Sequence, residues 1–238
     1  MAPGERWAAG LVGLNVAVTA HELAGSLPDI ATLRERCRAL AVLEAILSPD
    51  EESRYYSFTS SWSEDEELAS MDNGSGDAWS IVFSPAGAFL RGFDHESSMS
   101  PAANDDELWP GLVDTVPEVF SAASNEPAFS YEGTLDATVC LWRQADDNRW
   151  HAGSIDFPDH PDPDGADRLF AVLVDSTGVA YQRFAADYYG RAVDLDAVRA
   201  VFALSPLTAS LVRHLNADRS TVALRTDLSH IGYPSQLA

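Results

Sequence analysis

The residues with the clearest chemical potential lie in the segment 91–101, "RGFDHESSMSP", where Asp94, His95 and Glu96 are consecutive. On an irregular loop these side chains can converge on a metal ion, or a carboxylate can hold the imidazole so that it acts as a general base. On a strand they could not all converge, because neighbours point to opposite faces. The triplet can equally be a contact surface, or a loop in which Asp94 caps backbone N–H groups.

A metal-assisted hydrolase would need further ligands beyond this triplet. His151, Asp156 and His160 are available downstream, but no zinc-binding spacing such as His-Glu-x-x-His connects them. The alternative interpretation is therefore a hydrolase that uses Asp94, His95 and Glu96, with Asp94, His95 and His151 as metal ligands. The preferred interpretation assigns no catalytic residue, no metal and no cofactor.

Two other motifs fail on closer inspection. In "DHPDPDGAD", aligning Gly165 with the glycine of a calcium-binding EF-hand loop puts Ala171 where the bidentate Glu belongs. Ser97 and Ser98 lie close to His95, but no Gly-x-Ser-x-Gly nucleophile elbow occurs in the chain. The sequence therefore predicts neither a calcium loop nor a serine hydrolase.

The charge is strongly one-sided. The chain carries 37 acidic residues against 15 basic ones, for a net charge of −22, and every basic residue is arginine. Such a surface repels nucleic acid and anionic lipid, and it attracts a basic protein partner. The simpler alternative is that acidity only keeps the protein dispersed. The candidate contact residues are acidic, aromatic and histidine side chains that we expect on the surface. They are Trp62, Glu64, Asp65, Glu66, Glu67, Asp94, His95, Glu96 and Trp109.

The two cysteines, Cys37 and Cys140, stand far apart in apolar surroundings, which predicts buried thiols and a reducing, cytoplasmic location. Residues 1–27 are predicted to be an apolar N-terminal arm or first helix that packs on the body. They also resemble a signal peptide, with Val18-Thr19-Ala20 as a possible cleavage site. No uninterrupted apolar run reaches the roughly 18 residues of a membrane span.

The pattern of the chain predicts an α+β fold. We expect a helix over 28–47, a strand within 54–62 followed by a mobile acidic loop up to Asp77, and hairpins over 78–93 and 134–157. Two short helical turns are expected within 104–124. The sheet is thus antiparallel and built from hairpins.

A helical C-terminal third completes the predicted fold. Helices are expected over 166–174, 181–189, 194–204 and 206–215, with the third one capped near Asp194, and the aromatic residues of the second are expected in the core. Residues 28–216 are interpreted as one α+β domain, and 217–238 as a polar C-terminal tail.

Three motifs carry a resemblance to a known group: Gly92-Phe93-Asp94-His95-Glu96, Leu108-Trp109-Pro110-Gly111 and Leu141-Trp142-Arg143. Over about residues 28–216 the chain resembles a group of uncharacterised bacterial proteins found in settings typical of immunity proteins of polymorphic or contact-dependent toxins. The resemblance implies an inhibitor that occludes the active site of a basic toxin or enzyme. It transfers no catalytic residue. Acids within 50–77 and 94–107 would then face the partner's basic side chains.

Overall fold

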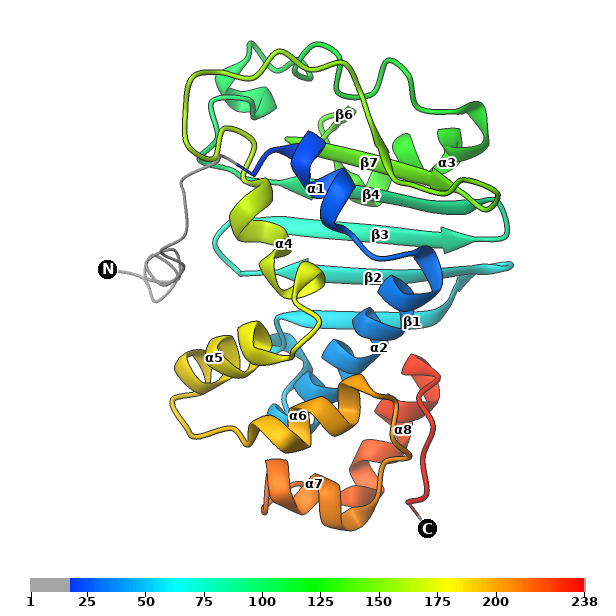
Figure 1. The fold of residues 1–238 in the computed structure, drawn as a ribbon, viewed down its shortest axis with the longest axis vertical. Coiled ribbons are helices and arrows are strands. Elements are labelled where there is room, and N and C mark those ends of the chain that lie inside the picture. The colour runs from blue at the N-terminus through cyan, green and yellow to red at the C-terminus, as the bar shows by residue number, and fades with distance from the viewer. Residues whose placement is uncertain (1–17, 238) are drawn as a thin grey trace. The chain divides into compact units, whose positions relative to one another are not determined.

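The computed structural model describes residues 18–237, and its fold is α+β, as predicted. The main sheet is antiparallel, with strand order β1-β2-β3-β4-β7-β8, and a small second sheet pairs β5 with β6 (Figure 1). The described chain divides into two compact units. We call residues 18–30 and 70–171 the sheet unit, and residues 31–69 and 172–237 the helical unit.

The centre of the sheet unit is the hairpin of β3 (Ala78–Ser84) and β4 (Gly87–Phe93), which confirms the hairpin predicted over 78–93. The strands pair from Ala78 opposite Phe93 to Ser84 opposite Gly87. β4 also pairs with β7 (Val139–Gln144), and β7 pairs with the short β8 (His151–Ala152). The second predicted hairpin is therefore confirmed, with a shorter return strand than expected.

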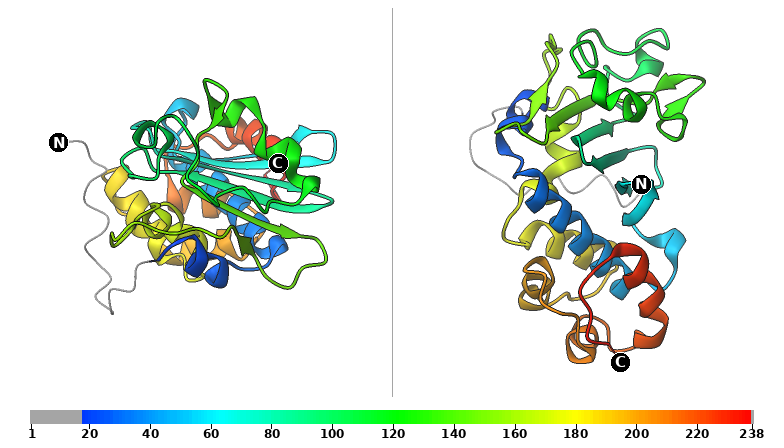
Figure 2. Two further views of the ribbon diagram at one scale, coloured as in Figure 1. Left: turned by 90° about the horizontal axis from the view of Figure 1, so that it is seen from above. Right: turned by 90° about the vertical axis from the view of Figure 1, so that its right-hand side faces the viewer.

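One face of this sheet is covered by two helices, α1 (Ala20–Ser26) and α4 (Ala166–Val174). Figure 2 shows them on the same side of the strands. Gly92 lies directly beneath α4, because a Cβ on it would come within 2.6 Å of the Phe170 ring. α1 lies at the end of the predicted N-terminal arm, residues 1–27, and the rest of that arm, residues 1–17, lies outside the described residues.

A single buried carboxylate ties α1 to α4. The Ala20 amide donates to Asp164 Oδ2 at 2.8 Å, and the Ala166 amide donates to Asp164 Oδ1 at 3.1 Å. Both amides belong to first turns of helices, where N–H groups have no partner within the helix. Asp164 is fully buried, and this burial raises its pKa to about 7.

The opposite face of the sheet is covered by the long segment 101–136. The Phe120 ring lies 6.3 Å from the Phe89 ring, and the Arg91 guanidinium lies 5.1 Å from the centre of the Phe129 ring. The segment contains only short elements: η3 (Pro101–Ala103), η4 (Glu118–Phe120), α3 (Ser121–Ser124), η5 (Pro127–Phe129), β5 (Ser130–Tyr131) and β6 (Thr134–Leu135). The helical turn expected after Pro117 is confirmed. The prediction of a helical turn around Pro110 is wrong, because residues 104–116 form bends and non-helical turns.

Two glycines allow this segment to cross the chain near β8 at very short range. A Cβ on Gly111 would lie 2.0 Å from the Ser154 carbonyl oxygen, and a Cβ on Gly153 would lie 1.8 Å from the Gly111 carbonyl oxygen. Gly111 also has φ +85°, which favours glycine. The crossing therefore requires glycine at both positions.

The helical unit contains α2 (Ile30–Leu47), predicted over 28–47, together with α5 (Val179–Tyr188), α6 (Leu195–Phe202) and α7 (Ala209–Leu215). These helices confirm the predicted C-terminal pattern. Asp194 caps α6 as expected, because its carboxylate accepts from the Ala197 amide at 2.7 Å.

Two expectations about this unit are wrong. The acidic stretch is not a loop: β1 (Tyr56–Ser63) turns at Glu64 and Asp65 into β2 (Glu66–Asp72). The strand forms because Leu68, Ala69 and Met71 are buried. The C-terminal stretch is not a loose tail either, since α8 (Thr221–Ile231) buries Leu224, Leu228 and Ile231, and Ser220 and Gly232 cap it.

The interior of the helical unit holds one carboxylate. Glu44 is fully buried, and its oxygens accept from the Tyr181 and Tyr189 hydroxyls and from the Tyr55 amide, each at 2.7 Å. Burial raises the pKa of Glu44. Tyr181 and Phe184 are core residues as expected, whereas Tyr188 is exposed.

Both cysteine thiols are buried and form no disulfide, which confirms the prediction for Cys37 and Cys140. None of the helices within residues 18–237 combines the length and the apolar character that crossing a membrane requires.

Candidate functional site

The site begins with a rigid turn before β3. Asn73 Oδ1 accepts from the Ser75 amide at 2.7 Å and from the Asp77 amide at 3.0 Å, while Asn73 Nδ2 donates to Asp77 Oδ2 at 2.8 Å. Asparagine favours such turns because its side chain bonds its own backbone. The turn fixes the Asp77 carboxylate at the open end of the β3–β4 hairpin.

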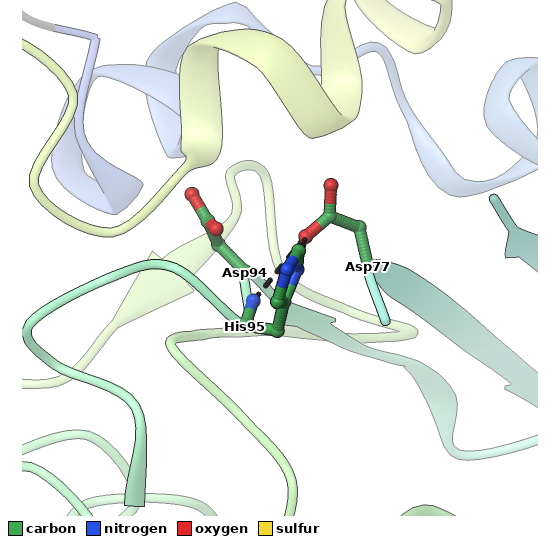
Figure 3. A group of neighbouring side chains, drawn as sticks. All are labelled: Asp77, Asp94 and His95. Atoms are coloured by element: carbon green, nitrogen blue, oxygen red, sulfur yellow. Dashed lines mark hydrogen bonds and ion pairs between the residues drawn. The ribbon is translucent and has the colours of Figure 1, made fainter. Parts of the chain in front are cut away.

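The hairpin register brings the predicted loop to the same place. Because Ala78 is opposite Phe93, Asp77 and Asp94 both lie just beyond the ends of their strands. His95 Nδ1 lies 2.8 Å from Asp77 Oδ1, and the His95 amide donates to the same oxygen at 3.2 Å. Figure 3 shows the imidazole directed toward Asp77, with both carboxylates pointing toward α4.

Arg168 of α4 completes the cluster. Its Nη2 lies 2.8 Å from Asp94 Oδ2, and its Nη1 donates to Asp77 Oδ2. Two glycines leave room for this arrangement, since a Cβ on Gly76 would lie 2.9 Å from the His95 ring and one on Gly165 would lie 2.6 Å from Asp94 Cβ. We call Asp77, Asp94, His95 and Arg168 the hairpin-end cluster.

Charge balance within the hairpin-end cluster keeps Asp77 ionised. Burial alone would raise the pKa of Asp77, but the hydrogen bonds from Arg168 and His95 outweigh it and lower the pKa below its ordinary value. The same carboxylates raise the pKa of Arg168. The cluster is thus a salt-bridged network at the edge of the sheet unit.

Asp77, Asp94 and His95 have ligand atoms close enough together to share an ion. Their atoms are already in use, however. The Asp77 oxygens accept from Arg168, Asn73 and His95, and Asp94 accepts from Arg168 and from the Glu96 amide at 3.0 Å. A cation would have to displace the Arg168 guanidinium, so these residues do not fit a metal ion.

The cluster has one feature in common with acid–base sites. Asp77 accepts from His95 Nδ1–H, an arrangement that leaves Nε2 as the basic nitrogen. Nε2 makes no hydrogen bond within residues 18–237, and the His95 side chain is 40% exposed. A serine nucleophile is not supplied by Ser97, because its hydroxyl donates to the Pro163 carbonyl oxygen at 2.6 Å. The dyad can move a proton, but the described residues complete no catalytic triad.

The other predicted site residues of the sheet unit lie apart from this cluster. Glu96 is exposed beside it. His151 lies on β8, 3.5 Å from Asp147, and does not belong to the group that could share an ion. Trp109 donates from Nε1 to the Asp156 carbonyl oxygen at 3.0 Å.

The remaining predicted contact residues belong to the helical unit. Trp62 is 39% exposed on β1, and Glu64 and Asp65 are exposed at the turn that follows. Glu67 is less available, because it pairs with Arg34 at 3.4 Å and with Arg38. Glu66 is partly exposed.

A groove in the segment 101–136 was not predicted. It is an open groove of about 560 Å³. Its apolar part consists of Leu108, Val113, Val116, Pro117 and Leu135, and its acidic part consists of Asp106, Glu107 and Glu118. We call it the acidic groove. Trp109, a predicted anchor, is not among its lining residues.

The residues that sequence reasoning missed are Asp77, Arg168 and the groove. The predicted 78–93 hairpin contained a signal for Asp77, since antiparallel pairing places the residues that flank the two strands side by side. Arg168 and the groove depend on contacts between segments far apart in the chain.

Comparison with protein-family models, with curated proteins and with solved structures finds no match to this chain.

Proposed function

We propose that this protein is an acidic protein-binding module of the cytoplasm: an immunity or inhibitor protein that neutralises a basic toxin or enzyme by occluding its active site. The observation that carries the proposal is the distribution of charge. The sheet unit holds 21 acidic residues and 4 arginines, whereas the helical unit holds 15 acidic residues and 10 arginines. Of the 22 net negative charges, 17 therefore belong to the sheet unit.

Within the sheet unit, the excess is densest along one stretch. Residues 92–142 contain ten acidic residues and no arginine, and His95 is the one basic-type side chain. Asp105, Asp106, Glu107, Asp114 and Glu118 are all exposed. A one-sign field of this kind speeds association with an oppositely charged protein and disfavours nucleic acid.

The proposal is tested with the product of the gene immediately upstream of this one. We expect that product to stop growth when expressed alone, and co-expression of this protein to restore growth. The purified pair should associate about ten-fold more slowly when NaCl is raised from about 50 mM to about 500 mM. Association that is indifferent to salt, or a harmless upstream product, would contradict the proposal.

The absence of lysine from the sequence sharpens this experiment. A carbodiimide joins carboxylates directly to amines, so the acids of this chain can be joined only to its own N-terminus or to amines of a partner, chiefly its lysines. Cross-linked peptides should come mainly from residues 94–136. Cross-links confined to residues 50–67 would instead place the contact on the helical unit.

The alternative, a metal-assisted hydrolase, stays a prediction: the Asp77–His95 dyad offers it a base, but Arg168 occupies the carboxylates that an ion would need. Metal analysis of the purified protein separates the two functions. Stoichiometric zinc or manganese that is lost in a His95→Ala variant would favour the hydrolase.

A further inference from the structure

Apolar side chains line the floor of the acidic groove, and their contact with water is unfavourable. Leu135 is buried, and Leu108, Val113, Val116 and Pro117 are partly exposed along the groove. Val119 and Tyr131, which adjoin the groove residues Glu118 and Ser130 in the sequence, are also exposed, by 47% and 69%. These apolar side chains give an occupant with some apolar side chains of its own a place to pack.

The acidic side chains of the groove are uncompensated. Asp106, Glu107 and Glu118 are exposed, and their carboxylates make no hydrogen bond or ion pair within the described part of the chain. A neutral occupant would bury these charges without a partner, which is costly. The occupant must therefore bring positive charge.

The polar lining of the groove supplies acceptors but few free donors. The Asn125 amide donates to the Ser121 carbonyl oxygen at 2.8 Å, Ser130 Oγ donates to the Glu126 carbonyl oxygen at 3.2 Å, and Thr134 Oγ1 donates to the Asp106 carbonyl oxygen at 3.2 Å. Because these donors are engaged within the protein, the groove suits an occupant rich in N–H groups. Arginine has five such groups and lysine three.

We propose that the acidic groove binds a segment of a protein partner in which arginine or lysine side chains are interspersed with apolar ones. The proposal rests on the proposed function and names the surface on which the basic partner docks. The cationic groups pair with Asp106, Glu107 and Glu118, and the apolar side chains cover Leu108, Val113 and Val116. The negative charge and the apolar lining of the groove thus favour the same kind of occupant.

Two peptides test the occupant. One is an acetylated, amidated peptide of four Arg-Leu repeats, and the other has four Arg-Ser repeats, so that both carry the same charge. Isothermal titration calorimetry of the full chain should show the Arg-Leu peptide binding about ten-fold tighter or more. Equal affinities, or no binding of either peptide, would overturn the groove proposal.

Two variants test the location. Asp106→Asn, Glu107→Gln and Glu118→Gln together remove three charges from the groove. Asp146→Asn, Asp156→Asn and Asp159→Asn remove three exposed charges elsewhere in the same unit. Both variants therefore have the same net charge, and circular dichroism checks that both remain folded. The groove variant should lose about ten-fold or more in affinity for the Arg-Leu peptide, and the matched variant less than about three-fold.

The outcomes separate the two proposals. Equal losses in both variants would show that only the overall field matters, which overturns the groove and leaves the proposed function standing. A groove variant that loses peptide binding but still protects cells from the upstream gene product would place the toxin contact elsewhere. Failure of protection by the wild-type protein, with intact peptide binding, would remove the immunity function and leave the groove as a basic-segment binding site.

Discussion

The two units use their acidic residues in different ways. In the helical unit, carboxylates meet internal partners: Glu67 pairs with Arg34 and Arg38, and Asp227 pairs with Arg54 at 2.8 Å and with Arg219 at 2.7 Å. In the sheet unit, the acids along residues 105–118 are exposed in a stretch that contains no arginine. Net charge alone hides this difference. Glu67 and Asp227 thus hold parts of the helical unit together, whereas the acids along residues 105–118 are exposed and available to a partner.

The largest expected effect concerns Glu44 of the helical unit. Glu44→Ala leaves the Tyr181 and Tyr189 hydroxyls and the Tyr55 amide without their acceptor and creates a cavity. We expect a loss of about 3–5 kcal/mol in the free energy of unfolding, measured with urea. The control is Glu64→Ala at the exposed turn, which should change stability by less than about 0.5 kcal/mol. Similar losses of unfolding free energy in both variants would show that the buried Glu44 contributes no more to the fold than an exposed acid does.

A second prediction concerns pH and the buried Asp164 of the sheet unit. Its raised pKa of about 7 means that the folded state holds this proton more tightly than the unfolded state. The resulting stabilisation is complete below about pH 4 and is lost as the pH rises toward 7, on the order of 2–4 kcal/mol. Asp164→Asn cannot lose a proton, so its unfolding free energy should lack this component between about pH 4 and 7. Parallel pH profiles for the two proteins would contradict the expectation.

The third prediction concerns the hairpin-end cluster, in which acidic residues of the sheet unit pair with an arginine, as Glu67 and Asp227 do in the helical unit. Arg168→Gln leaves Asp77 and Asp94 without their cation, and we expect a loss of about 2 kcal/mol at pH 7, since water reaches the 34% exposed Arg168 side chain. Because the pKa of Asp77 is lowered, this difference should shrink as the pH falls below about 4. Arg149→Gln, at an exposed arginine of the same unit, is the matched control and should be nearly neutral.

The smallest effect on stability is expected at the acidic groove. The variant Asp106→Asn, Glu107→Gln, Glu118→Gln should stay within about 0.5 kcal/mol of the wild type, because these carboxylates have no internal partner. Asparagine tolerates the positive φ of 61° at position 106. A large loss of stability would show that these acids support the fold, as Glu67 and Asp227 of the helical unit do.

Much of the fold was predictable because its signals are local. Helix α2 follows from apolar spacing, and the β3–β4 hairpin follows from alternation around Pro85 and Gly87. β2 was missed because Glu66 and Glu67 are unusual in a strand, and the pairing of Glu67 with two arginines of α2 cannot be read along the chain. α8 was missed although Leu224, Leu228 and Ile231 have helical spacing between two capping residues.

The candidate site was predictable only in part. The Asp94-His95-Glu96 triplet marks the right hairpin end, but its chemistry depends on Asp77, 18 positions away, and on Arg168 of α4. Of the alternatives for the triplet, the capping role of Asp94 is observed, since its carboxylate accepts from the Glu96 amide. Asp94 and His95 lie together in the hairpin-end cluster, whereas the Glu96 side chain is exposed beside it.

The crossing of Gly111 and Gly153 has a consequence for how quickly a partner can be captured. Since only hydrogen fits at each position, the segment 101–136 lies in close contact with the chain beside β8 about a third of the way along its length. A segment that is already ordered before binding loses little conformational entropy when a partner docks on it. Any side chain at position 111 would loosen that contact, so the segment would have to be reordered at each encounter and the affinity for its partner would fall.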